Sequence, residues 1–163
     1  MRRAHHLHAD GLTLLEALLA AVVLAMAASA VIMPYAVGAQ ATMRDARQTL
    51  AVNLAQDMME EILTKAFSDP EGDETGEKDR SSWDDMDDYD GYEEKAGTIR
   101  SFDGTLMDDP AAAGLSRHVS VVGVYVSGQD TGQPPTFLRI TVEIRHNGQT
   151  VTSLSRLVYA NAS

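Results

Sequence analysis

The chain of 163 residues contains no cysteine. A disulfide framework and a cysteine-ligated metal site are therefore both excluded. A small exported domain would thus lack one of its common covalent stabilisers. Basic residues are also few, with 13 Lys and Arg against 24 Asp and Glu, and the formal net charge is −11 at pH 7. Because phosphate binding requires Lys and Arg side chains that displace counterions, this charge argues against nucleic acid as a partner.

Motifs that would carry catalysis are missing as well. The sequence has neither a nucleophile motif nor a glycine-rich phosphate-binding loop. Three of the five histidines lie in the first ten residues, and only His118 and His146 occur later, where we expect them on the surface. We therefore expect a protein that is not an enzyme.

Charged side chains are absent from residues 17–43. About 20 apolar residues suffice for a helix to cross a bilayer core of about 30 Å. Arg2 and Arg3 precede this run, and positive residues on that side place the N-terminus in the cytoplasm. The sequence therefore predicts a single membrane-spanning helix with the rest of the chain outside. Pro34 lies within the run and should bend the helix.

Glu16 stands at the start of the apolar run. A carboxylate in hydrocarbon costs on the order of a few kcal/mol, so Glu16 either ends the polar flank or needs a partner or a function. A secretory signal peptide is a competing interpretation, because Ala28-Ser29-Ala30 offers an Ala-x-Ala cleavage site after a basic region. Glu16 inside the apolar region disfavours that interpretation, and plain anchoring without cleavage is a third one.

The segment Gly11-Leu12-Thr13-Leu14-Leu15-Glu16 and the apolar run after it resemble the prepilin peptidase recognition site of type IV pilins and type II secretion pseudopilins. In that family the leader ends in Gly, a large apolar residue follows, and a Glu stands five places beyond the cut. The resemblance implies cleavage between Gly11 and Leu12 and N-methylation of Leu12, which stands where the family usually has Phe. It also implies an assembly role for Glu16, whose carboxylate would pair with the new amine of a neighbouring subunit. Pro34 matches the family's common helix-kinking Pro.

The same resemblance implies partners and a location. The partners would be a prepilin peptidase that also methylates, other pilins or pseudopilins, and an inner-membrane assembly platform. The chain would sit in the inner membrane with its C-terminal domain in the periplasm, and then in the pilus or pseudopilus. The segments 15–19 and 53–62 are similar to minor pilins and minor pseudopilins rather than to abundant major pilins.

Beyond Pro34 the apolar residues recur every three or four positions, at Met43, Ala46, Leu50, Leu54, Met58 and Ile62. That spacing predicts a helix with one buried face, ending near Phe67 before a loop. We therefore expect a leader over residues 1–11 and one long helix over 12–67. Its membrane half would cover 12–39, and its amphipathic half 40–67.

The middle of the chain is strongly acidic, with thirteen Asp or Glu in residues 69–95. It lacks periodicity and contains several glycines, so we expect a loop region over 68–116. The stretch Trp83–Tyr92 resembles a segment of minor pilins of the mannose-sensitive haemagglutinin type.

Clustered carboxylates in this stretch suit a hard cation such as calcium, and the candidate ligands are Asp85, Asp87, Asp88 and Asp90. The spacing is not that of an EF-hand, because Met86 and Gly97 would occupy the first and twelfth ligand positions. The alternative is a solvated loop whose Trp83, Tyr89 and Tyr92 pack over the sheet.

The sequence pattern of residues 117–163 predicts an antiparallel sheet. The stretch 117–127 is rich in β-branched residues and should bulge near Gly123, and 137–145 alternates apolar with polar residues. Asn147-Gly148 predicts a tight hairpin turn into a returning strand over 149–159. A fourth strand over 98–102 is considered as well. The expected fold class is α+β, with the long helix packed on a small C-terminal sheet as in pilin-like proteins.

We therefore expect a minor pilin or pseudopilin, a structural subunit of a type IV pilus or type II secretion pseudopilus. The alternative is a membrane-anchored extracytoplasmic module that binds a cation or another ligand through the acidic loop. A hydrolase anchored by the helix comes last, because no catalytic site supports it.

Overall fold

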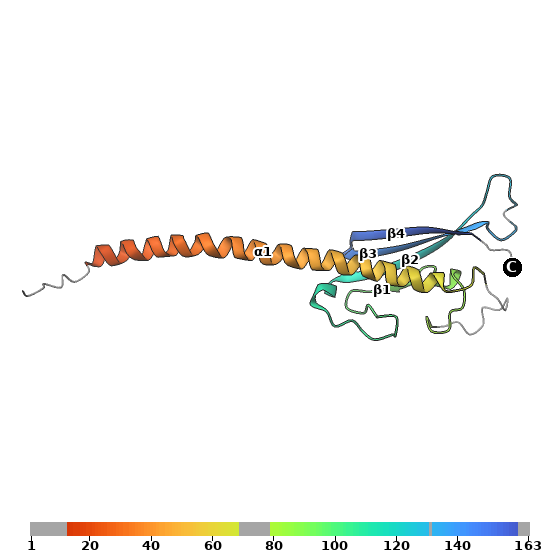
Figure 1. The fold of residues 1–163 in the computed structure, drawn as a ribbon, viewed down its shortest axis with the longest axis horizontal. Coiled ribbons are helices and arrows are strands. Elements are labelled where there is room, and N and C mark those ends of the chain that lie inside the picture. Colours follow the sequence, from red (N-terminus) through yellow and green to blue (C-terminus); the bar gives the residue numbers. More distant parts are fainter. Residues whose placement is uncertain (1–12, 69–78, 131, 160–163) are drawn as a thin grey trace, which may run out of the picture. The chain divides into compact units, whose positions relative to one another are not determined.

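The computed structural model describes residues 13–68, 79–130 and 132–159. The described part contains the helix α1 (Leu14–Leu63) and four strands, β1 (Glu93–Glu94), β2 (Leu115–Val124), β3 (Phe137–His146) and β4 (Gln149–Tyr159). Two short 3-10 helices, η1 (Asp87–Tyr89) and η2 (Pro110–Ala112), lie between α1 and β2 in sequence. The expected α+β layout, a long N-terminal helix and a small antiparallel sheet, is confirmed (Figure 1).

Contacts divide the chain into two compact units, Met1–Thr42 and Met43–Ser163. In the first unit, every described side chain is exposed. This part of α1 is long and apolar enough to cross a membrane, as the sequence predicts. Helical structure continues through Pro34.

The second unit is built on a four-stranded antiparallel sheet in the order β1-β2-β3-β4 (Figure 1). Strands β2 and β3 pair without interruption from Leu115↔His146 to Val124↔Phe137. The predicted bulge near Gly123 is wrong, because Gly123 pairs regularly with Leu138. The irregularity lies between β3 and β4, at Ile144/Arg145.

The turn and the fourth strand test two further details of the sequence interpretation. Asn147 and Gly148 have φ of 51° and 82°, so the predicted hairpin turn is confirmed. The fourth strand is Glu93–Glu94, which pairs with β2, and not residues 98–102. In that region Arg100 and Leu106 form only an isolated bridge.

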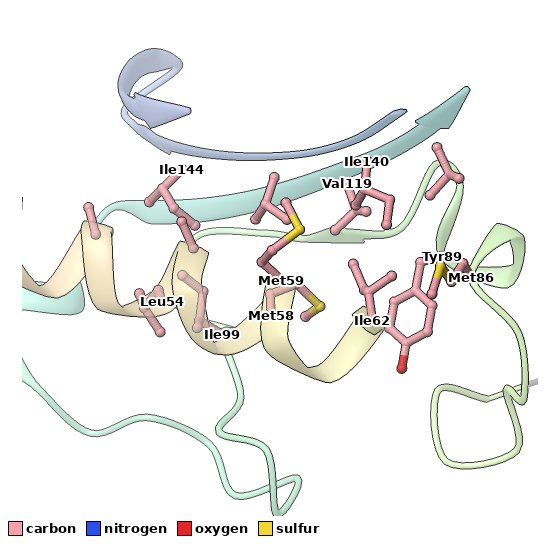
Figure 2. Packing of buried hydrophobic residues seen from close by; sticks show 14 of the residues in the cluster. Leu54, Met58, Met59, Ile62, Met86, Tyr89, Ile99, Val119, Ile140 and Ile144 are labelled. Carbon is pink, nitrogen blue, oxygen red and sulfur yellow. The ribbon is translucent and has the colours of Figure 1, made fainter. Parts of the chain in front are cut away.

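The core lies between the C-terminal part of α1 and the sheet. Leu54, Met58, Met59 and Ile62 of the helix form one buried cluster with side chains of the sheet such as Val119 and Ile140 (Figure 2). The predicted buried face of the helix is therefore confirmed from residue 51 onward, whereas Met43 is 44% exposed. No residue of β4 is fully buried, so this edge strand is the least covered part of the sheet.

Helix α1 ends at Leu63, four residues before the expected end near Phe67. The backbone N–H groups of Thr64 and Lys65 donate to the carbonyls of Glu61 and Ile62, three residues back, which tightens the last turn. Ala66 then forms a parallel bridge with Asp85. This bridge attaches the acidic segment to the end of the helix.

Candidate functional site

The first candidate site is the exposed apolar surface of α1 before residue 43. Leu14, Val31 and Tyr35 are 83%, 72% and 81% exposed, and the neighbouring Leu, Val and Met side chains are similar. Burying one such side chain contributes about 1.5–3 kcal/mol. A surface of this length therefore requires a membrane, other helices, or both.

The start of α1 carries a local feature that the sequence interpretation missed. The Glu16 backbone N–H donates to Thr13 Oγ1 at 3.3 Å, and the Ala17 N–H donates to the Thr13 carbonyl at 3.0 Å. Thr13 is therefore the N-cap of the helix. Thr13-x-x-Glu16 also has the spacing of a capping box, a signal that the sequence did contain. Gly11 and Leu12, the predicted cleavage and methylation positions, lie outside the described residues.

The second candidate site is a buried charge network in the globular unit. Its members are Glu61 of α1, Arg80, Glu94 of β1 and Arg117 of β2, which are 7%, 16%, 5% and 2% exposed. Two acidic and two basic side chains alternate along it, so the network is electrically balanced. Such a balance is required, because an unpaired buried charge is strongly destabilising.

Glu61 is held by two side chains from the acidic segment. Arg80 forms an ion pair with its carboxylate, and Arg80 Nε donates to Oε1 at 2.6 Å. The Tyr89 hydroxyl donates to the same Oε1 at 2.9 Å. Burial alone raises the pKa of Glu61, but the hydrogen bonds and charge of Arg80, with Tyr89, outweigh burial and hold that pKa below its usual range.

Arg117 connects the sheet to the helix. Its Nε donates to Glu94 Oε2 at 2.7 Å, and the two side chains form an ion pair. Its Nη1 donates to the Leu54 carbonyl of α1 at 3.2 Å, and its Nη2 to the Arg100 carbonyl at 3.0 Å. Burial lowers the pKa of Arg117, and the nearby Glu94 charge partly offsets this. A guanidinium nevertheless stays protonated in proteins, so Arg117 acts as a permanent buried cation.

Aromatic side chains cover one side of the network. The Trp83 ring lies 4.7 Å from the Tyr89 ring and 5.2 Å from the Tyr92 ring, centroid to centroid, both in edge-to-face geometry. The Arg80 guanidinium stands 5.8 Å from the Tyr92 ring centroid. Tyr89 is fully buried, while Trp83 and Tyr92 are half-buried. Tyr89 belongs to the buried core cluster, and Trp83 and Tyr92 pack against that cluster.

Three of the four aspartates proposed as calcium ligands, Asp85, Asp88 and Asp90, accept hydrogen bonds from backbone N–H groups. Asp85 Oδ1 accepts from the N–H groups of Asp87 and Asp88, each at 3.1 Å. Asp88 Oδ2 accepts from the Asp84 N–H at 3.1 Å, and Asp90 Oδ1 accepts from the Val121 N–H of β2 at 2.8 Å. These carboxylates therefore shape the segment and attach it to the sheet.

No three or more His, Asp or Glu side chains within residues 13–68, 79–130 and 132–159 are arranged so that they could hold a metal ion. Asp85 is 2% exposed. Burial, with the nearby charges of Asp87 and Asp88, raises the pKa of Asp85 to about 6. Calcium binding by Asp85, Asp87, Asp88 and Asp90 stays a prediction.

A hollow of about 560 Å³ opens beside the charge network. Its charged lining residues are three acidic and three basic side chains, namely Glu61, Asp79, Asp103, Lys65, Arg80 and Arg100. Arg80 and Glu61 already pair with each other there. The hollow therefore shows no preference for a ligand of one charge.

Comparison with known proteins gave no match to a family model, to a curated protein or to a solved structure. A family assignment for this chain therefore depends on its own N-terminal residues and on the arrangement of its helix and sheet.

Proposed function

We propose that the chain is a minor pilin or minor pseudopilin, a structural subunit of a type IV pilus or a type II secretion pseudopilus. It is cleaved between Gly11 and Leu12 by a prepilin peptidase and N-methylated at Leu12. It then enters the filament by helix packing against other pilins or pseudopilins at an inner-membrane assembly platform. In this role the chain is not an enzyme.

The proposal depends on two features that occur together, the N-terminal motif and a continuous helix. The Gly11-Leu12…Glu16 motif overlaps the start of a helix, α1, whose described residues up to Thr42 are all exposed. The same helix then supplies Leu54, Met58 and Ile62 to the core of an antiparallel sheet. A signal peptide has no need for a helix that continues into a globular core, so this continuity favours a retained, packed helix over a removed one.

Glu16 has a defined part in this proposal. After cleavage, Leu12 carries a cationic amine, and the Glu16 carboxylate of one subunit pairs with the amine of a neighbour. Each charge alone is costly in hydrocarbon, and breaking such a pair costs more than forming it gains. The pair therefore sets the axial register between subunits and contributes little bulk affinity.

The experiment compares Glu16→Ala with Glu60→Ala, which removes an exposed carboxylate of the same helix. We expect both variants to insert and to be cleaved, because neither change touches Gly11 or Leu12. Glu16→Ala should be at least tenfold depleted from filaments sheared off native cells, whereas Glu60→Ala should be present at the wild-type level. Equal incorporation of Glu16→Ala and wild type would refute the assembly role of Glu16.

The alternative function, a membrane-anchored module that binds a cation or another ligand, is less well supported. The carboxylates of Asp85, Asp88 and Asp90 accept backbone hydrogen bonds, which gives the acidic segment a structural use without a ligand. A correctly cleaved chain that never associates with filaments would favour this alternative.

A further inference from the structure

The sheet carries an exposed apolar patch on the face turned away from α1. Side chains alternate along a strand, so Arg139, between the buried Leu138 and Ile140, points to this outer face. Val122 and Leu157, its partners on the two neighbouring strands, are each 52% exposed. We call this patch the platform, and it comprises the cross-strand rows Val122-Arg139-Leu157 and Val124-Phe137-Tyr159.

The platform has the composition of a binding surface. Tyr159 is 58% exposed, and its ring lies 5.4 Å from the Phe137 ring, centroid to centroid. Exposed apolar patches that contain aromatic and Arg side chains are typical of protein–protein contacts. Arg139 stands among these apolar residues without an acidic partner in the part of the chain that the structure describes. The surface that covers the platform should therefore be apolar and should supply a carboxylate.

A loop of the same chain, residues 101–106, has this chemistry, and we call it the knob. Phe102 and Leu106 are 77% and 51% exposed, and Asp103 between them is exposed as well. Asp103 Oδ1 accepts the Thr105 backbone N–H at 2.9 Å, so the loop is held in shape before it binds anything. The second carboxylate oxygen of Asp103 is left for a cation from another chain.

The knob and the platform lie on opposite sides of the globular unit. Phe102 and Asp103 line the hollow beside Glu61 and Lys65, at the C-terminal end of α1. The platform is on the sheet face that points away from this helix. The two surfaces can therefore meet only between two chains. A symmetric contact of two platforms would instead bring two Arg139 side chains together without an acid, which is unfavourable.

We propose that the platform binds the knob of a second copy of this chain, with Phe102 and Leu106 on the apolar rows and the Asp103 carboxylate paired with Arg139. Such a contact is heterologous, because each copy uses two different surfaces and can bind a neighbour on each side. Both surfaces are small, so the contact is weak and forms between chains held in one membrane, where their effective concentration is high. The inference goes beyond the proposed function and does not depend on cleavage.

The absence of cysteine from the chain allows a direct test by disulfide crosslinking. Two full-length single-cysteine variants, Thr105→Cys in the knob and Ser155→Cys in the row next to the platform, are mixed in phosphatidylcholine liposomes and oxidised. We expect the mixed dimer, identified by mass, to exceed both self-crosslinked dimers by more than random pairing allows. Glu60→Cys, on the exposed side of α1, replaces Ser155→Cys as the control and should give little mixed dimer.

Charge reversal then identifies the ion pair. Arg139→Asp in the Ser155→Cys chain should lower the yield of mixed dimer about fivefold, as expected for an exposed ion pair. Asp103→Arg in the Thr105→Cys chain should restore the yield. Both residues are exposed, so the circular dichroism spectra of the variants should match that of the wild type.

Three results would overturn the contact and leave the proposed function intact. The first is an equal yield of mixed dimer with and without Arg139→Asp. The second is a predominance of the Ser155→Cys self-dimer, which would assign the platform to a symmetric dimer. The third is protection of Ser155→Cys from a maleimide by the liposomes without any crosslink, which would assign the platform to a lipid surface.

Discussion

Arg117 shows what a single residue does in this molecule. It is 2% exposed, and it binds Glu94, a helix carbonyl and a loop carbonyl at once. Taking a charge out of water is costly, and a buried ion pair is only weak support for stability by itself. Arg117 satisfies polar groups from three segments in one geometry. We therefore expect its main contribution to be the unique docking of α1, β1 and the 100–106 loop on the sheet.

Removing this cation should strongly destabilise the globular unit. Arg117→Met leaves Glu94 buried without its main counter-charge and should lower the free energy of unfolding by about 3–5 kcal/mol. Arg139→Met, on the exposed face of β3, is the matched control and should change it by less than about 0.5 kcal/mol. Urea unfolding in detergent micelles, followed by Trp83 fluorescence, measures both.

The same experiment includes a double variant. Arg117→Met combined with Glu94→Met removes both charges and should recover part of the lost stability, because no uncompensated charge then remains. If Arg117→Met alone lay within 1 kcal/mol of wild type, the network would not be holding the unit together.

The raised pKa of Asp85 leads us to expect that the stability of the fold depends on pH. The folded state raises its pKa from 3.8 to about 6, so the folded chain binds this proton more tightly than the unfolded chain. The resulting contribution to the free energy of unfolding is fully present below about pH 3.8 and is lost as pH rises through about 6. Because pH 5 lies only about one unit below the folded pKa, acidification from pH 7.5 to 5 should stabilise the wild-type chain by about 1.4 kcal/mol.

Asp85→Asn isolates this effect, because the amide oxygen can still accept backbone hydrogen bonds while the group no longer titrates. The variant should lack the gain in stability between pH 7.5 and 5. The effect of Glu61 on stability has the opposite dependence on pH, because the folded state lowers its pKa. Its contribution to the free energy of unfolding is present above about pH 4.5 and is lost at lower pH. Parallel pH profiles of wild type and Asp85→Asn would contradict the assignment to Asp85.

At the scale of secondary-structure elements, helix α1 has a buried part and an exposed part with different roles. Between residues 51 and 62 its buried residues form one stripe that packs on the sheet, and the residues between them, such as Gln56, Asp57 and Glu60, are exposed. Before residue 43 the helix has no buried side chain among its described residues. The stripe over residues 51–62 is therefore buried by the chain's own sheet. The apolar surface before residue 43 must be covered by a membrane or by other molecules.

Truncation within the buried stripe should reduce stability through the cavity that it leaves. Met58 is fully buried, and Met58→Ala should cost about 2–5 kcal/mol. Gln56→Ala changes an exposed residue of the same turn and should have almost no effect. Thermal unfolding monitored by near-ultraviolet circular dichroism distinguishes them, and equal midpoints for the two variants would contradict the packing in Figure 2.

The regular elements could be predicted because their patterns are local. Alternation along 137–145 and the Asn147-Gly148 turn predict the hairpin of β3 and β4, and the three-to-four spacing predicts the core face of α1. The strand β1 is only two residues long, too short for any periodic pattern. The irregularity at Ile144/Arg145 depends on pairing between strands, and the glycine at 123 suggested a different position.

The charge network was harder to find, because its members are far apart in sequence. Glu61 and Arg80 are separated by 19 positions, and Arg117 and Glu94 by 23. One signal was available: Arg117 falls on the same strand face as the buried Val119 and Val121. A charged residue at a core-facing position requires a buried partner. The sequence could therefore have predicted that a counter-charge exists, but not which acid supplies it.

At the scale of the whole molecule, two units of different character share one chain. One offers an exposed apolar helix that is long enough to cross a membrane, and the other is an α+β unit with its own core. A carbonate or high-salt wash should leave the chain in the membrane fraction, because its attachment is apolar and not electrostatic. Release by salt alone would contradict a membrane-spanning helix.

The central claim is that the chain is processed as a prepilin and keeps its helix. Intact-mass and N-terminal peptide analysis of the protein recovered from native membranes tests this most directly. We predict a chain that begins at N-methylated Leu12. A chain that begins at Val31, after Ala28-Ser29-Ala30, would show conventional secretion and would contradict the account.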